Sequence, residues 1–333
     1  MPAAAVLILM TAVTLASGGD GFPAPPAARE LPPAPVTAPL KDHFPPRTVC
    51  PNWQSSSGDV PESGGPRLRS AAWYVVDEEN GRILTAHDAE TPVPIASITK
   101  LAAALVYADC QVPDDKVISI DEEAREFLQI TRSRLRVGSR FRAGDLIDSA
   151  LVSSDNRAMV SLARATGLSM DEFVRRMNAK GSELGLDGFE FHDPTGLDPR
   201  NRASARSAAR LLAAAAAHPK IGPILGLPEY SLLHVDRGRQ IHAHNSNALM
   251  RNQRWEVLAS KTGYTLAAGS CLVMRTRLAD GRLVTVALLG AEGVGSRYGD
   301  AARLRSWLEG PIAGRPSVLA SHRLSPHRRH ARG

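Results

Sequence analysis

The chain has 333 residues, of which 22% are charged and 43% are hydrophobic. This is the composition of a globular protein and argues against a wholly disordered, collagen-like or coiled-coil chain. Forty Lys and Arg residues against 34 Asp and Glu residues give a formal net charge of +6. Residues 311–333 hold five arginines and no acid, and subtracting them leaves about +1 for the rest of the chain. The folded part therefore lacks the charge surplus of a nucleic-acid-binding protein.

The N-terminus carries an apolar run from Ala3 to Ala16. Fourteen residues are too few for a comfortable membrane span but suit the core of a signal peptide, and the run ends in small residues that suit cleavage. No Lys or Arg precedes the run, so an apolar terminus without an export role, or a misplaced start, is the alternative. We predict a signal peptide over 1–16 and export to the periplasm or the cell envelope outside the cytoplasmic membrane.

Two segments lack the pattern of a folded core. Residues 17–66 are rich in Pro, Ala and Ser, and residues 311–333 are basic with several prolines. Such segments bury too little apolar surface to offset the entropy of ordering. We predict a disordered linker, a catalytic domain over 67–310 and a disordered basic tail. The tail is either simply solvated or contacts a cell-wall polyanion.

The folded part begins with a predicted β-hairpin. Residues 71–77 and 82–87 are rich in β-branched and aromatic side chains, and Glu79-Asn80-Gly81 separates them. An Asn-Gly turn between two such runs is typical of a hairpin. A helix rich in Leu and Ala is predicted over 97–108.

The remaining elements are first helical and then extended. Apolar residues at helical spacing predict helices near 121–127 and over 143–152, 156–165, 170–185 and 203–218. The C-terminal part predicts strands at 255–261, 269–277 and 283–290, closed by a helix at 300–308. This order predicts an α+β fold with a helical block and an antiparallel sheet to which both ends of the folded part contribute strands.

The first chemical motif is Ser97-Ile98-Thr99-Lys100. Only six of the 40 basic residues are lysines, and a lysine, unlike an arginine, can lose its proton when buried. Positions i and i+3 share a helix face, so a neutral Lys100 could take the proton of Ser97. The positive end of the helix dipole would favour the developing negative charge at Ser97. Taken alone, the motif could equally be a helix cap with a solvated lysine.

The second motif is Ser154-Asp155-Asn156, which lies between two predicted helices. Its hydroxyl could relay a proton and its amide could bind a substrate carbonyl. Three polar residues between helices are also an ordinary turn or N-cap.

The third motif is Lys261-Thr262-Gly263, which we expect at the end of the strand that begins at Trp255. The glycine would let a substrate backbone approach an edge strand, and the lysine would bind a carboxylate. The alternative is a polar strand end followed by a turn.

In this order and on these elements, the three motifs resemble the penicillin-binding proteins and serine β-lactamases. The chain is most similar to the low-molecular-mass D-alanyl-D-alanine carboxypeptidase and endopeptidase family, serine peptidase family S11, and within it to the penicillin-binding protein 7 subgroup. The resemblance spans about 69–309 and is carried by 94–101, 152–158, 193–197 and 260–276. It implies the β-lactamase/transpeptidase-like fold, peptidoglycan stem peptides as substrate and β-lactam antibiotics as covalent inhibitors.

The resemblance also implies roles for the three motifs. Ser97 would be the acylated nucleophile and Lys100 its general base. Ser154 would pass a proton to the leaving amine, and Asn156 would hold the substrate amide. Lys261 would support the relay and bind the carboxylate side of the substrate.

Further substrate contacts are implied around the third motif. Thr262 would share the contact of Lys261, while Gly263 would allow the substrate backbone to approach. The backbone N–H groups of Ser97 and Tyr264 would form an oxyanion hole. Arg297 is a candidate for carboxylate binding, with an ordinary surface arginine as its alternative.

The alternatives to a DD-endopeptidase are a class A β-lactamase, a catalytically dead scaffold and a carboxypeptidase. A class A β-lactamase needs a Glu-x-x-Leu-Asn loop after the second motif, but residues 190–198 show no such pattern, so a DD-peptidase is favoured. A catalytically dead peptidoglycan-binding scaffold is disfavoured by the intact nucleophile and base. Typical carboxypeptidases append a β-rich domain and an amphipathic anchor helix, and only a short tail follows Pro311, so the endopeptidase is favoured over the carboxypeptidase.

The chemistry predicted here needs no cofactor. Neither CxxC nor HExxH occurs, and most of the ten histidines are scattered, so no metal site is expected. The three cysteines are an odd number and form no tidy disulfide framework. Cys110 is expected at a helix end, and Cys271 lies in an apolar strand, where we expect a buried, inert thiol.

Overall fold

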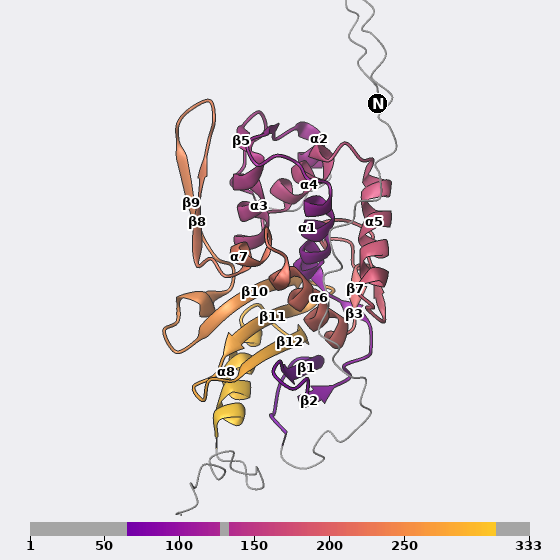
Figure 1. The fold of residues 1–333 in the computed structure, drawn as a ribbon, viewed down its shortest axis with the longest axis vertical. Coiled ribbons are helices and arrows are strands. Elements are labelled where there is room, and N and C mark those ends of the chain that lie inside the picture. The colour runs from indigo at the N-terminus through magenta and orange to yellow at the C-terminus, as the bar shows by residue number, and fades with distance from the viewer. Residues whose placement is uncertain (1–64, 127–132, 311–333) are drawn as a thin grey trace, which may run out of the picture. The chain divides into compact units, whose positions relative to one another are not determined.

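The computed structural model describes residues 65–126 and 133–310 (Figure 1). The predicted signal peptide, nearly all of the linker, Cys50 and the basic tail therefore lie outside the described residues. Within the described ranges, no helix combines the length and the apolar character that crossing a membrane requires.

A five-stranded antiparallel sheet contains strands from both ends of the folded part, as predicted. Its strand order is β10-β11-β12-β1-β2, so β10 is an edge strand. Tyr74 pairs with Ala287, which joins the N-terminal hairpin to the C-terminal strands. The five strands are β1 (Ala72–Asp77), β2 (Ile83–His87), β10 (Glu256–Thr265), β11 (Gly269–Arg277) and β12 (Leu283–Ala291).

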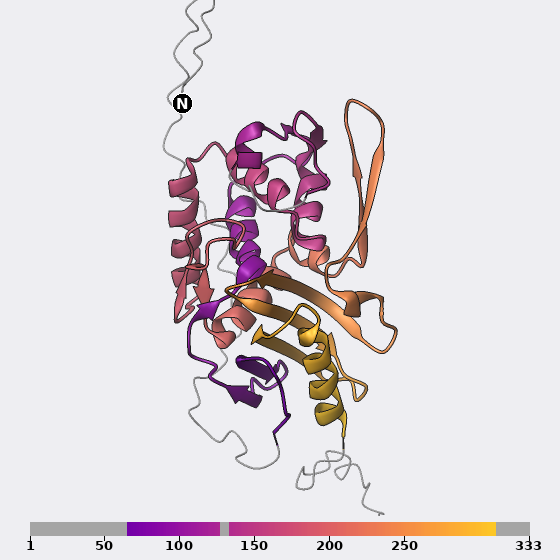
Figure 2. The same ribbon diagram turned by 180° about the vertical axis from the view of Figure 1, so that it is seen from behind.

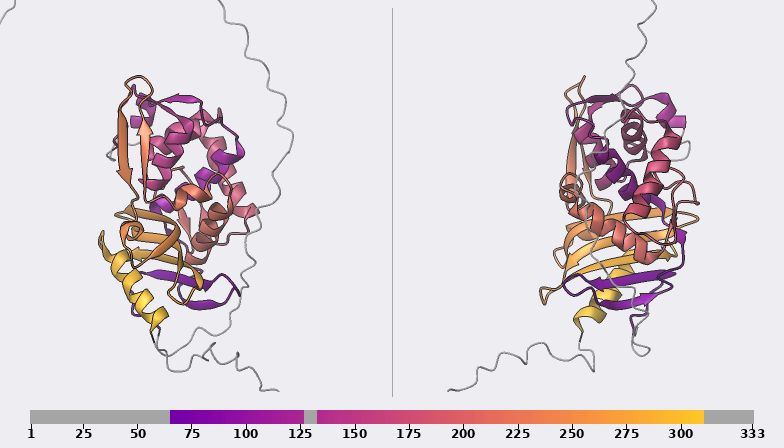
Figure 3. Two further views of the ribbon diagram at one scale, coloured as in Figure 1. Left: turned by 60° about the vertical axis from the view of Figure 1, so that its left-hand side comes forward. Right: turned by 45° about the vertical axis from the view of Figure 1, so that its right-hand side comes forward.

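Successive side chains of the sheet alternate between two hydrophobic clusters because strand side chains have a period of two. On β11, Cys271 and Val273 join the cluster shared with the helical block, and Leu272 and Met274 join the other. The first face packs against α6 (Ala205–Ala217) and the second against α8 (Ser296–Glu309) (Figure 3). α8 begins four residues before the predicted start.

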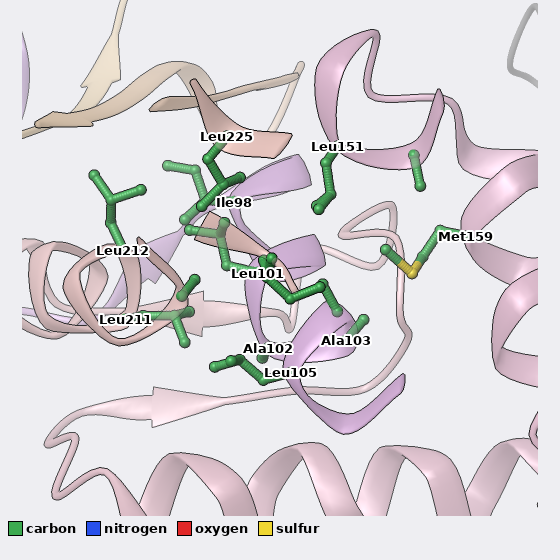
Figure 4. Packing of buried hydrophobic residues seen from close by; sticks show 14 of the residues in the cluster. Ile98, Leu101, Ala102, Ala103, Leu105, Leu151, Met159, Leu211, Leu212 and Leu225 are labelled. Atoms are coloured by element: carbon green, nitrogen blue, oxygen red, sulfur yellow. The ribbon is translucent and has the colours of Figure 1, made fainter. Parts of the chain in front are cut away.

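The helical block surrounds α1 (Lys100–Asp109), which is buried from its first residue to Tyr107. A helix that is apolar on all sides belongs in a core. Helices α4 (Asn156–Ala165), α5 (Met170–Glu183) and α6 pack against it (Figures 1 and 2). Leu101, Ala102 and Leu105 of α1 lie among side chains that include those of α4 and α6 (Figure 4). The other helices of the block are α2 (Glu122–Glu126), α3 (Ala143–Val152) and α7 (Gly222–Leu225).

The boundaries of α3 and α4 are those predicted. The C-terminal ends of α5 and α6 lie within two residues of the predicted ends. Two expectations need correction. Ser97 lies in a 3₁₀ turn, η1 (Ala96–Thr99), before α1 rather than in the α-helix itself. The third motif lies inside β10 rather than at its end, because the pairing with β11 continues through Thr265.

A hairpin of β8 (Glu229–Leu233) and β9 (Gln240–His244) was not predicted. It stands beside α3 and is drawn in orange in Figures 1 and 3. The shorter elements are β3 (Val93–Pro94), β4 (Val117–Ser119), β5 (Arg140–Arg142), β6 (Phe189–Glu190), β7 (Arg202–Ala203) and η2 (Ala248–Arg251).

Candidate active site

The three motifs meet at one place although they lie far apart in the sequence. The Nζ atom of Lys100 donates to the Ser97 hydroxyl at 2.8 Å and to Asn156 Oδ1 at 2.5 Å. The Nζ atom of Lys261 donates to the Ser154 hydroxyl at 2.7 Å. Each serine thus has a lysine as its partner, and Asn156 joins the second motif to Lys100.

Lys100 is fully buried at the first position of α1. Its third acceptor is the backbone carbonyl of Thr195, at 2.8 Å. Burial lowers the pKa of Lys100 from 10.5 to about 7, and the carboxylates of Asp193 and Asp155 oppose this only in part. A substantial fraction of Lys100 is therefore neutral near neutral pH and able to accept a proton.

Ser154 has a left-handed backbone conformation, with φ of 63°. Non-glycine residues with such φ values are uncommon and are held there by their surroundings. The next residue, Asp155, caps α4 by accepting from the Ala158 N–H at 3.0 Å, and it also accepts from the Ser133 hydroxyl at 2.7 Å. These contacts position the turn that carries Ser154.

Lys261 is 1% exposed on the edge strand β10. Besides the hydroxyl of Ser154, its ammonium group contacts the backbone carbonyl of Thr262 at 3.0 Å. Burial lowers the pKa of Lys261 well below its ordinary value, and the positive charges of Lys100 and Arg297 lower it further. The positive charge of Lys100 therefore disfavours the protonated form of Lys261.

Two glycines let the backbone on both sides of the Ser97 turn approach closely. A Cβ atom at Gly263 would lie 2.7 Å from the Ile95 carbonyl oxygen and 3.0 Å from the Ser97 nitrogen. At Gly196, where φ is +85°, a Cβ atom would lie 1.9 Å from the carbonyl oxygen of Ala96. The nucleophile is thus enclosed between β10 and the loop that contains Gly196.

The other sequence-predicted residues lie on or near β10. The Thr262 hydroxyl is 2.7 Å from the hydroxyl of Ser246, and Tyr264 is 42% exposed. Arg297 is buried, and its Nη1 atom donates to the backbone carbonyls of Gly263 at 2.5 Å and Cys271 at 3.1 Å. The alternative of an ordinary surface arginine is wrong: Arg297 holds the backbone of β10 and β11, and its contact with a substrate carboxylate stays a prediction.

The loop that follows β6 carries none of the three motifs, but it also contributes to the site. The carboxylate of Asp193 accepts from the N–H groups of Thr195 at 2.5 Å, Gly196 at 2.8 Å and Asp198 at 2.7 Å. This arrangement holds the Thr195 carbonyl against Lys100. The Asp-Pro-Thr-Gly sequence, an Asx-turn former followed by a glycine, was the available signal.

The cysteines at the two described positions behave as expected. Cys110 follows the last residue of α1, and Cys271 is fully buried in β11. Burial raises the pKa of Cys271 to about 11, which makes it a poor nucleophile. Across 65–126 and 133–310, no cluster of three or more His, Cys, Asp or Glu residues could hold a metal ion.

The sequence of the chain is similar to those of known D-alanyl-D-alanine peptidases. The profile of the peptidase S11 family, described as D-alanyl-D-alanine carboxypeptidase, matches residues 60–292. A D-alanyl-D-alanine endopeptidase of Pseudomonas aeruginosa is 36% identical over 282 residues, which are 84% of this chain and 91% of that protein. A D-alanyl-D-alanine endopeptidase of Escherichia coli is 32% identical over 259 residues, 78% of this chain and 83% of that protein.

Solved structures agree with the predicted fold. A D-alanyl-D-alanine carboxypeptidase from Mycobacterium tuberculosis superposes with a TM-score of 0.64 at 26% identity, over 75% of this chain and 94% of that one. The Streptomyces K15 DD-transpeptidase superposes with a TM-score of 0.65 at 20% identity, over 73% and 98%, and supports the fold alone. The predicted penicillin-binding protein fold and family are confirmed. The chain belongs to the D-alanyl-D-alanine carboxypeptidase family, peptidase family S11.

Proposed function

We propose that the protein is an exported serine DD-peptidase that hydrolyses D-alanyl-linked peptide bonds of peptidoglycan through an acyl-enzyme on Ser97. The observation that carries this proposal is the contact between Lys100 Nζ and Ser97 Oγ, at 2.8 Å, in a site that lowers the pKa of Lys100 to about 7. A nucleophile beside a base that is neutral at working pH is the arrangement that acyl transfer needs. The names of the family and of the relatives support the substrate class.

The contacts suggest how acylation proceeds. Neutral Lys100 takes the Ser97 proton while Ser97 Oγ attacks the D-Ala carbonyl carbon. The N–H groups of Ser97 and Tyr264 stabilise the resulting oxyanion, which is usually the largest single catalytic contribution. As the C–N bond breaks, the leaving amine receives a proton through the Ser154 hydroxyl, which Lys261 holds at 2.7 Å.

Substrate binding would use the side chains next to the reacting groups. Asn156 would hold the substrate amide, and Lys261, Thr262 and Arg297 would lie on its carboxylate side. Gly263 would let the substrate backbone pair with the edge strand. Water then attacks the acyl-enzyme ester, releasing the peptide acid and restoring Ser97.

The arrangement disfavours a β-lactamase. Within the described residues, no carboxylate is hydrogen-bonded to Ser97 or Lys100, and the Asp193 carboxylate is occupied by its own loop. A penicilloyl ester on Ser97 would thus lack a dedicated carboxylate base for hydrolysis. β-Lactam antibiotics should therefore act as covalent inhibitors.

The rate of acylation by a penicillin should depend on pH through Lys100. Only the neutral amine accepts a proton, so the rate constant should fall by about tenfold per pH unit below the pKa of about 7 and level off above it. Stopped-flow or quenched labelling between pH 5 and 9 measures the profile. A rate constant that stays flat down to pH 5 would contradict the general-base role.

We further propose that cross-linked peptides are better substrates than monomers. Purified protein should cleave the D-alanyl–diaminopimelyl bond of a dimeric muropeptide faster than it removes terminal D-Ala from a monomeric pentapeptide. Both substrates present the same carbonyl to Ser97, so the preference must arise on the leaving-group side, where each ~1.4 kcal/mol is a tenfold rate ratio. Initial rates, measured side by side by mass spectrometry, test this.

The two outcomes of that comparison are distinct. Faster release of D-Ala from the monomer would make the protein a carboxypeptidase with the same catalytic residues. The endopeptidase names of two relatives that are 36% and 32% identical favour cross-link cleavage.

The proposal also includes a cellular location and roles for the parts of the chain. The apolar run over 3–16 supports a signal peptide and a periplasmic or envelope location, where the enzyme would act in cell-wall biogenesis and cell shape. We propose residues 67–310 as the catalytic domain. The basic tail is proposed as a contact with cell-wall polyanions.

A further inference from the structure

A cavity lies between the β8–β9 hairpin and the segment 133–139. Its volume is about 350 Å³. We call it the hairpin cavity. Four of its eight lining residues are arginines, one is a histidine and none is acidic; they are Ser133, Arg134, Arg136, Ser139, His234, Arg237, Arg239 and Ile241.

The positive charge of this cavity is only partly neutralised from within the described part of the chain. No carboxylate there forms an ion pair with Arg136, Arg237 or Arg239, and the side chains of these three residues make no hydrogen bond. The acid nearest in sequence, Asp236, forms an ion pair with Arg140, lies 3.9 Å from His234 Nδ1 and attracts Arg237 without an ion-pair contact. Several unpaired guanidinium groups that share one cavity attract an anion that can occupy it.

One wall of the cavity is attached to the turn that carries Ser154. The hydroxyl of Ser133 donates to Asp155 at 2.7 Å, and Arg157 Nη1 donates to the Leu135 carbonyl at 2.6 Å. Ser133 lines the cavity and also supports the residue next to Ser154. One end of the cavity therefore lies close to the turn that carries Ser154.

The opposite wall is attached to the same turn. The Tyr230 hydroxyl at the base of the hairpin lies 2.8 Å from the hydroxyl of Ser153 and donates to the hydroxyl of Ser149 at 2.9 Å. A bond across the cavity joins the two walls, because Arg134 Nη1 donates to the His242 carbonyl at 2.9 Å. Both segments thus contact residues that flank Ser154, and Arg237 and Arg239 line the cavity from the loop that joins β8 to β9.

We propose that the hairpin cavity is a second substrate subsite, which binds free carboxylates of cross-linked stem peptides through Arg237 and Arg239. This inference rests on the proposed function, since it concerns the substrate of the same site. Guanidinium groups bind carboxylates in bidentate geometry, and a cross-linked peptide carries free carboxylates beyond the bond that is cut. A small β-lactam bound at Ser97 would not reach this subsite.

The test is a binding measurement that does not depend on turnover. Two proteins are compared: the full chain with Ser97→Ala, and the same chain that also carries Arg237→Gln/Arg239→Gln. Each is titrated with a dimeric muropeptide at low salt, and binding is measured by calorimetry. The backbone bonds of these residues to His234 remain in the double variant, so the hairpin should keep its fold. We expect Kd to rise about tenfold, and the difference to shrink at high salt.

Two controls isolate the cavity. Arg82→Gln/Arg254→Gln removes the same charge from exposed arginines outside the cavity and should leave Kd within about twofold. A dimeric muropeptide whose free carboxylates are converted to amides should bind the Arg237→Gln/Arg239→Gln variant as it binds the parent. Penicillin acylation of the protein with Ser97 intact should be unchanged by Arg237→Gln/Arg239→Gln.

Several outcomes would overturn the subsite. An unchanged Kd for the muropeptide with free carboxylates would contradict the proposal. An equal loss of affinity for the muropeptides with free and with amidated carboxylates would also contradict it. If pyrophosphate binding, but not peptide binding, is lost in the double variant, the cavity is a phosphate site and the proposal is wrong. If the carboxylate-dependent binding is found but the wild type hydrolyses no dimer, the proposed reaction fails while the subsite stands.

Discussion

Replacing Ser97 by Ala is expected to abolish covalent labelling by a fluorescent penicillin. The acyl-enzyme requires the Ser97 hydroxyl as nucleophile, and the residual reaction should be at least about 10³-fold slower. Lys100 would keep two of its three acceptors, Asn156 and the Thr195 carbonyl, so its ammonium would remain partnered. The fold should therefore persist. Gel-based labelling over time, with the thermal midpoint recorded for the same samples, gives both readouts.

A matched control is Ser182→Ala, which removes an exposed hydroxyl on α5. It should label at the wild-type rate. Labelling that persists in a folded Ser97→Ala variant would remove Ser97 as the nucleophile and, with it, the proposed reaction.

Replacing Lys100 by Arg should be almost as damaging as replacing it by Ala, although the positive charge is kept. A guanidinium group does not release its proton at accessible pH, so it cannot accept the proton of Ser97. A single nitrogen atom of Lys100 contacts Ser97, Asn156 and Thr195. Because Lys100 is fully buried, the larger guanidinium group of an arginine could not extend into solvent. We expect the acylation rate constant to fall about 10³-fold or more in both variants.

Lys116→Arg is the control for this substitution, because Lys116 is exposed and its Nζ donates to the carbonyl of Ala165. It should acylate within about twofold of the wild type. Near-ultraviolet circular dichroism and the thermal midpoint separate loss of chemistry from loss of fold. Rapid acylation by a folded Lys100→Arg variant would mean that Lys100 acts only by its charge.

Much of the fold follows from local pattern in the sequence. Apolar residues at helical spacing set the limits of α3 and α4, because those limits depend on side chains only a turn apart. Alternation and turn residues predicted the β1–β2 hairpin and strands β11 and β12 for the same reason. The β8–β9 hairpin was not predicted, although its polar and apolar side chains alternate and Tyr230 and Leu232 are buried between exposed neighbours. The alternation covers only five residues in each strand, and the period-two pattern was the available signal.

The residue types of the site could also be predicted from the sequence, since Ser97, Lys100, Ser154 and Lys261 stand in short motifs of recognisable spacing. Their electrostatic state could not. The pKa of Lys100 is lowered mainly by burial, and burial depends on elements that are distant in the sequence. The partner of Lys100 in the Thr195 loop and the backbone contacts of Arg297 likewise arise only when those segments pack together.

The sequence by itself therefore determined the family, the order of the elements and the candidate nucleophile and base. Tertiary structure alone decided which groups are desolvated, which serine each lysine contacts, and that arginines from two distant segments line one cavity. The physical reason is one of range. Helix and strand preferences are set by near neighbours along the chain, whereas proton affinity and charge complementarity depend on everything within a few ångströms in space.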